Sequence, residues 1–527
     1  MFSQSRRTFL SKVGRGMLVA SLGAAIATDC GLVPAWADEG DDHDLKFGTL
    51  EPLVALLQET PADKLLPVLV EKLQGGLDLK TLTAAASLAN ARTFGGEHYG
   101  GFHSFMALAP AYQISQEMPK DWQPLPVLKV LYRNAVFTQS VGGRGHEQLH
   151  ATVTPAASAD EAQLRAAINR GDKAAAEQLL AALAKQSLEA AFNGALAGVE
   201  DNHDVHTVVL PWRAWAAVEF TGQEHALTLL RQSVRKCAQQ AVPRNDQQAK
   251  ELERKRKIVP KLLEQYKLLA QPAGKKHADD AFIEKLCNTI LQSSDEGAAE
   301  AIAGALAEGF APQELGEAIS LASNQLILRQ VENAPGNYGR RTHGDSMGVH
   351  ASDTTNAWRN IIRVCDPRHR AAGLMLAAAN VAQSATWGKS AKMLLEDEPY
   401  PHAEQVAAVK SNDKNDLLGD LADAIKTNNQ LAACAIVERY RDCHHAAGNV
   451  FDVLRGYAVS EDGRLHAEKY YRTVTEEFAT TRESLRWRQL VALARVTASE
   501  YGFDAQDKPS GRAPGYEEAK KLLGVEV

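Results

Sequence analysis

The sequence predicts an all-α fold, on three observations. Apolar residues recur three and four positions apart in alanine- and leucine-rich segments, which is the spacing of one helix face. Alternating runs of β-branched residues, which are typical of strands, are nearly absent. The one β-branched cluster is short and ends at Pro211. We therefore expect helices over segments such as 164–168, 174–183, 299–306 and 417–425.

The first 37 residues have the pattern of an export signal. Residues 5–10 read S-R-R-T-F-L, a twin-arginine signature, and an apolar stretch follows at 17–27. Residues 35–37 read A-W-A, a small-x-small cleavage site, and the apolar stretch is too short for a stable membrane anchor. We expect the twin-arginine (Tat) export machinery to recognise this signal and cleavage to follow Ala37. The mature protein is then periplasmic or secreted, with no integral membrane segment.

Charge and cysteine content exclude several classes of function. The chain carries a net charge of −7 and residues 1–37 carry +3, so the mature protein carries −10. An acidic balance gives no electrostatic reason to expect nucleic acid as a partner. The five cysteines after the signal include no C-x-x-C pair, which argues against a zinc ribbon, c-type haem attachment or a disulfide framework. The expected partner is a small-molecule substrate.

An internal repeat divides the mature chain. The pattern L-x-x-A-x-S-L-A at 82–89 recurs at 315–322, and L-x-x-A-I at 164–168 recurs at 421–425. Self-similarity of this kind indicates duplicated structural units. We expect a first helical half over 38–238, a charged connector over 239–276 and a second helical half over 277–527. These pseudo-repeated halves are expected to form one body around a shared site.

Histidines recur with the repeat. His103 ends a G-F-H and His350 a G-V-H, while His206 and His466 each precede a Glu-Phe pair further along the chain. Neutral imidazoles that converge in a helical protein suggest a transition metal. Duplicated ligands would be retained because each supplies a lone pair that Phe or Leu lacks. Retained ancestry and ordinary packing are the alternative explanation.

Lys426 has two interpretations. It follows an apolar helical stripe, and its counterpart in the first half is Asn169. A lysine in a last helical turn stabilises the carbonyl end of the helix dipole. A desolvated lysine instead has a lowered pKa, and its neutral amine can take up CO2 as a carbamate, an anionic oxygen ligand. Three further histidines precede the candidate ligands closely enough to contact them or a substrate: His98, His203 and His343.

The order of these residues on a duplicated helical chain resembles the questin oxidase-like family. That order is His103, His206, His350, Lys426 and His466. The family contains helical oxygenases that open the ring of anthraquinone-type substrates by Baeyer–Villiger-like chemistry. The resemblance covers most of the mature chain but rests on order and spacing rather than on a local motif.

The resemblance implies a function as well as a fold. It implies a non-haem iron held by the four histidines, with Lys426 carboxylated as a fifth ligand. It also implies an oxidoreductase that acts with O2 on an aromatic or quinone-like substrate, which the sequence does not identify. Most family members are intracellular, so the export signal is a departure, and a different substrate is expected. No catalytic residue beyond the ligands is assigned.

Two other functions remain open. His146, Glu147 and His150 form an H-E-x-x-H, which on a helix places two zinc ligands one turn apart with a glutamate as general base of a zinc hydrolase. Glycines before this motif and Pro155 after it argue against a long helix there. A non-catalytic helical-repeat binding protein with structural histidines is the second alternative. A G-x-S-x-G at 344–348 lacks the preceding strand that a nucleophile elbow needs, and it is discarded.

Overall fold

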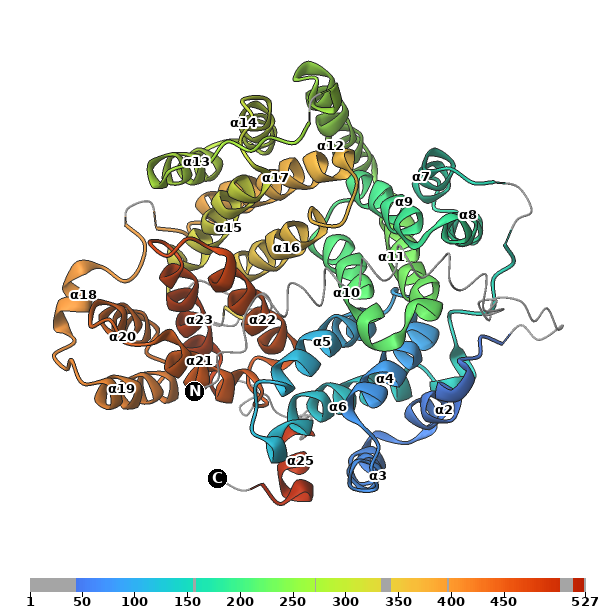
Figure 1. Cartoon of the computed structure of the whole chain (residues 1–527), viewed down its shortest axis with the longest axis horizontal. Helices are drawn as coiled ribbons and strands as arrows, with labels where there is room; N and C mark the ends of the chain where they lie inside the picture. The colour runs from blue at the N-terminus through green and yellow to red at the C-terminus, as the bar shows by residue number, and fades with distance from the viewer. Residues whose placement is uncertain are drawn as a thin grey trace. The chain divides into compact units, whose positions relative to one another are not determined.

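Helices follow one another along almost the whole of the described chain (Figure 1). The computed structural model describes residues 44–154, 158–270, 272–332, 343–395, 398–502 and 515–525. Over these ranges it holds no strand, so the all-α prediction is confirmed. The predicted export signal at 1–37 lies outside the described residues. No helix in the described part of the chain is long and apolar enough to cross a membrane.

In the described residues before the charged segment that was predicted to connect the halves, the chain forms ten α-helices. They are α2 (Glu51–Glu59), α3 (Ala62–Gln74), α4 (Leu79–Phe94), α5 (Tyr99–Ser115), α6 (Pro124–Ser140), α7 (Glu161–Asn169), α8 (Lys173–Gln186), α9 (Leu188–Asp201), α10 (Val205–Thr221) and α11 (Ala226–Gln240). The β-branched cluster that ends at Pro211 lies within α10. The charged segment itself contains α12 (Asp246–Gln265), whose Arg254 pairs with Asp295 at 2.5 Å.

The second half also consists of helices. Its helices are α13 (Asp280–Gln292), α14 (Asp295–Ala307), α15 (Pro312–Leu328), α16 (Met347–Ile361), α17 (Pro367–Ser390), α18 (Ala403–Ala408), α19 (Lys414–Lys426), α20 (Gln430–Asp442), α21 (Ala447–Ala458), α22 (Arg464–Thr480), α23 (Trp487–Glu500) and α25 (Gly515–Leu523). Alanine, leucine, isoleucine and valine side chains of both halves form one continuous apolar core.

Four helices that are distant in sequence lie side by side in the middle of this arrangement (Figure 1). Helix α5 packs against α10 and α22, and α16 packs against the same two helices. The outer helices follow a common order, since α4 contacts α5 and α11 as α15 contacts α16 and α23. A shared packing order is what a duplication leaves behind, but the pseudo-repeat itself stays a prediction.

Candidate metal centre

The four repeat-related histidines converge on one place. His103 lies on α5, His206 on α10, His350 on α16 and His466 on α22. Their ring centroids form a closed circuit of 4.9 Å (103 to 206), 6.0 Å (206 to 350), 5.5 Å (350 to 466) and 5.2 Å (466 to 103). Adjacent rings in the circuit are steeply inclined to each other, between 62° and 71°. We call these four side chains the histidine quartet.

Each member of the quartet has a buried Nε2 without a hydrogen-bond partner among the described residues. In His103 the Nδ1–H donates to the carbonyl oxygen of Tyr99 at 2.8 Å, so the lone pair is on Nε2. In His206 the Nδ1 lies 3.4 Å from the carboxylate of Asp204, which favours the same tautomer. Buried polar atoms are nearly always paired, so four orphans at one point require an explanation.

Electrostatics keep three members of the quartet uncharged. Burial lowers the pKa of His350 to about 3 and the pKa values of His103 and His466 well below the ordinary histidine value. The positive charge of Lys469 and the neighbouring rings add to this effect. Neutral imidazoles keep their lone pairs, and this is the state in which histidine binds metals.

The residues that cap the helices explain why the histidines lie in the first turns of α10, α16 and α22. Asp204 caps α10 by accepting from the backbone N–H of His206 at 2.6 Å. Ser346 caps α16 in the same manner through Val349, so the serine of the G-x-S-x-G pattern is a helix cap. Gly463, with a φ of 67°, precedes α22. Each cap places a histidine within the first turns of its helix.

The glycines of G-F-H and G-V-H have a packing role. A Cβ on Gly101 would lie 2.3 Å from the ring of Phe94 on α4, and a Cβ on Gly348 would lie 2.6 Å from Ile327 on α15. Such distances are far below a van der Waals contact, so only glycine permits these close helix pairs. The repeated motif therefore places α5 and α16 in register with their neighbours, and it fixes where His103 and His350 lie.

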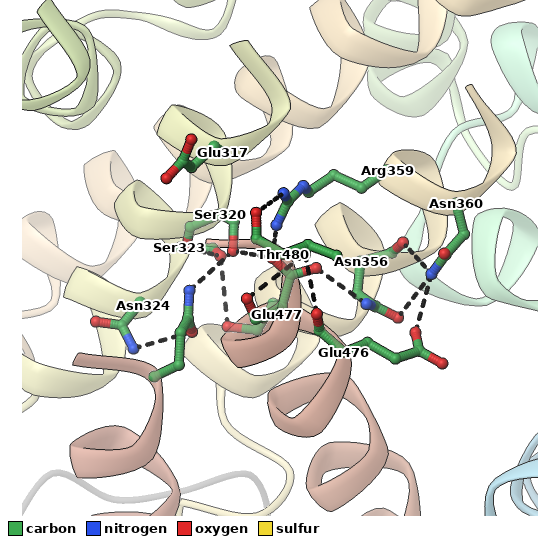
Figure 2. A network of polar contacts seen from close by, with 12 residues as sticks. Glu317, Ser320, Ser323, Asn324, Asn356, Arg359, Asn360, Glu476, Glu477 and Thr480 are labelled. Atoms are coloured by element: carbon green, nitrogen blue, oxygen red, sulfur yellow. Dashed lines mark hydrogen bonds and ion pairs between the residues drawn. The ribbon is translucent and has the colours of Figure 1, made fainter. Parts of the chain in front are cut away.

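A buried polar network holds two of the four helices together (Figure 2). Glu477 on α22 accepts hydrogen bonds from Asn356 of α16 at 2.9 Å and from Ser320 of α15 at 2.5 Å, and it pairs with Arg359. Asn360 donates to the adjacent Glu476 at 2.9 Å. The network sets the alignment of α16 on α22, and with it the positions of His350 and His466.

The structure does not bring Lys426 to the quartet. Lys426 is the last residue of α19, which packs against α20, α21 and α23 rather than against the histidine helices. Its side chain is 55% exposed and lies 3.9 Å from the carboxylate of Asp423. An exposed amine is not desolvated, so the condition for a carbamate is not met there. The interpretation as a last-turn lysine describes it correctly.

The sequence analysis missed a lysine that is close to the quartet. Lys469 is buried on α22, three residues after His466, and burial lowers its pKa to about 8. Asp353 is buried on α16, three residues after His350, and accepts from the hydroxyl of Thr473 at 2.8 Å. The corresponding residues of the first half, Met106 and Val209, are apolar. The i+3 spacing on a helix, which places both residues on the histidine face, was the available signal.

The three neighbouring histidines have separate roles. His98 accepts from the N–H of Gly101 at 3.0 Å and begins α5, so it positions the helix of His103. His203 accepts from the indole of Trp358 at 3.4 Å, and burial lowers its pKa to about 4. His343 pairs with Gln430 at 2.7 Å, and burial lowers its pKa to about 3.

The H-E-x-x-H motif does not form the geometry of a zinc hydrolase. A short 3₁₀ turn, η3 (Gly143–His146), ends at the first histidine, and Glu147 is extended. Glu147 pairs with the buried Arg92 at 3.0 Å instead of facing a ligand pair. Since no helix runs from His146 to His150, the two imidazoles are not one helical turn apart.

A second group has the spacing of a metal site, because ligand atoms of Glu161, Asp366 and His369 lie within 4.8 Å of one another. We call these three residues and Glu200 the His369 cluster. The buried His369 donates from Nδ1 to Glu200 at 2.6 Å and from Nε2 to Glu161 at 3.3 Å, and Asp366 lies 3.7 Å away. Burial disfavours the charged ring, but its hydrogen bonds to the carboxylates outweigh that effect and raise the pKa of His369 to about 9. A protonated imidazole has no lone pair to offer a metal.

Compared with known proteins, the chain matches no family model, no curated protein and no solved structure. The chemistry of the quartet is therefore the main indication of function.

Proposed function

We propose that the histidine quartet binds one transition-metal ion and that the protein is a metal-dependent oxidoreductase. The observation that carries the proposal is the set of four buried Nε2 atoms without a hydrogen-bond partner among the described residues. Leaving a buried polar atom unpaired costs about 1–3 kcal/mol. A shared metal ion would satisfy all four atoms at once.

The spacing of the rings comes close to what this occupant requires. A metal about 2.1 Å from each nitrogen lies about 3.2 Å from each ring centre. Ring centres of neighbouring ligands are then about 4.6 Å apart at a 90° angle and about 5.3 Å apart at a tetrahedral angle. The observed separations of 4.9–6.0 Å begin within this range and slightly exceed it.

Iron is the metal we propose, with zinc as the weaker option. Imidazole ligands suit zinc, copper, iron and nickel alike, so the ligand set alone does not choose. The resemblance to the questin oxidase-like family favours non-haem iron, which when bound supplies redox chemistry with dioxygen. The protein would contribute rigid ligands through the capped helices and the Glu477 network, and a core that limits access of water. An aromatic or quinone-like substrate follows from the resemblance alone.

We assign the lysine implied by the resemblance to Lys469 in place of Lys426. Lys469 is buried, lies on the same helix as His466, and has a lowered pKa that makes its neutral amine accessible. Carbamate formation would join the amine nitrogen to the carbon of CO2 and release one amine proton to solvent. The product would supply the anionic oxygen that four neutral imidazoles lack.

Metal analysis of the mature protein tests the proposal. Protein purified without chelator or a histidine tag should contain about one iron per chain, since the site shares one set of ligands. His350→Ala should lose it, whereas His277→Ala should keep it, because His277 is 89% exposed and distant from the ligand helices. Bound zinc would contradict the redox function, and a folded, metal-free protein would contradict the site itself.

A further inference from the structure

A small pocket reaches one member of the quartet. His466 forms part of its wall together with Ala467 and Tyr470 of α22 and with Leu493 and Val496 of α23. The surface that faces the pocket is mainly apolar, although Asp462, Thr497 and Glu500 also line it. The half-buried Tyr457 and Tyr501 complete the lining. The pocket therefore lies between partly accessible residues and a buried candidate ligand.

The size of the pocket restricts its occupant. The space open to the centre of a small molecule is about 30 Å³. A water molecule needs about 10–15 Å³ of such space, so the pocket holds a molecule of two or three atoms. A fused aromatic ring system does not fit. A mainly apolar surface also disfavours water, because it offers few of the two to four polar partners that retain a water molecule.

The geometry points to this pocket as the place where dioxygen collects and passes to the metal centre. Dioxygen is small, uncharged and apolar, so it partitions into apolar space that water leaves empty. The pocket connects that property with His466, a proposed ligand. This inference rests on the proposed function, and it assigns Val496, Leu493 and Ala467 to the access of the oxidant. The organic substrate then reaches the centre by another side.

Two variants on one helix separate this role from general packing effects. Val496→Phe fills the pocket from α23. Val491→Phe is the matched control, since it makes the same change on the same helix but lines a different, roomier pocket of about 320 Å³. Ala467→Leu narrows the first pocket from α22 and replaces Val496→Phe if that variant does not fold.

Xenon binding tests the pocket independently of any metal. Crystals of the mature protein under xenon pressure should show a xenon atom beside Leu493 and Val496, and Val496→Phe should remove it. Absence of xenon from the wild-type pocket would overturn the inference. Because xenon needs no iron, this result stands even if metal analysis contradicts the proposed function.

Oxidation kinetics test the route. The reduced iron protein should be oxidised by dioxygen about tenfold more slowly in Val496→Phe, because restricted access lowers the association rate. The iron content of Val496→Phe should equal that of the wild type, and Val491→Phe should react at the wild-type rate. Oxidation of Val496→Phe at the wild-type rate, with the pocket filled, would overturn the route.

Discussion

The histidine quartet and the His369 cluster are two buried histidine sites in one helical protein, and the pKa values of three quartet histidines and of His369 are shifted in opposite directions. In the quartet, imidazoles neighbour imidazoles and a lysine, and burial lowers the pKa values of His103, His350 and His466. His369 is equally buried, but three carboxylates surround it, and its pKa rises to about 9. Burial alone therefore does not decide whether a histidine is charged.

The difference distinguishes a site with free ligand atoms for a metal from a site whose hydrogen bonds join helices. Both ring nitrogens of His369 donate to carboxylates on α7 and α9, so α17 of the second half is joined to two helices of the first. Arg165 and Arg368 complete the charge balance around Glu200. The cluster is satisfied without a metal, whereas the quartet has four acceptors left over.

Replacement of His369 should have the largest effect on stability. His369→Ala removes the donor that lies closest to the buried carboxylate of Glu200, which keeps only its longer contacts with Arg165 and Arg368. Removal of one member of a buried pair costs about 3–5 kcal/mol. Denaturant unfolding measures this loss. His277→Ala is the control, since it removes a histidine paired with Glu314 at an exposed position, where about 0.2–1 kcal/mol is expected. Equal losses of unfolding free energy in the two variants would contradict this structural role of His369.

The pH dependence of stability should identify the charge on His369. A pKa raised from 6.5 to about 9 corresponds to about 3 kcal/mol. That contribution is fully present below pH 6.5, because the proton is then bound in both states, and it is lost as pH rises towards 9. The difference in unfolding free energy between the wild type and His369→Gln should shrink over this window. A difference that stays constant from pH 6 to pH 9 would show a neutral His369.

Lys469 and Lys426 should differ in their effect on metal binding. Lys469→Met should weaken metal affinity by about 10–100-fold, the usual effect of removing a residue that supports a metal site. Lys426→Met, at an exposed helix end, should leave affinity unchanged. Competition with a chelator measures both. A loss of metal affinity in Lys426→Met but not in Lys469→Met would make Lys426 the relevant lysine. Unchanged affinity in both variants would show that neither lysine supports the metal site.

Replacement of His98 should have the smallest effect. His98→Ala removes the side-chain cap of α5 and should cost about 1 kcal/mol. His98→Asn should recover most of this, because asparagine also caps helices. Thermal unfolding measures the two variants. A larger loss in His98→Asn than in His98→Ala would contradict the capping role.

Repeat patterns led to the fold and to the four histidines, since periodicity and the G-x-H motif are local properties of the sequence. These local patterns did not identify which lysine lies close to the histidine quartet. Lys426 matched the order of a family pattern, but its exposure is set by how α19 packs. Lys469 was recognisable only once His466 was placed on a helix, where a residue three positions later shares its face.

The H-E-x-x-H motif also shows that a local sequence pattern does not decide whether a site forms. Its letters match a zinc site, but Glu147 is held by Arg92, a residue 55 positions earlier in the chain. Such a long-range partner is not visible in the motif. The glycines before the motif and Pro155 after it were the local signal that a helix would not form.

Anomalous diffraction at the metal absorption edge tests the central claim most directly. Crystals of chelator-free mature protein should show one peak among His103, His206, His350 and His466, about 2.1 Å from the Nε2 atoms. The iron edge should identify the element. A peak at Glu161, Asp366 and His369, or no peak in a folded protein, would contradict the assignment of the quartet as the metal centre.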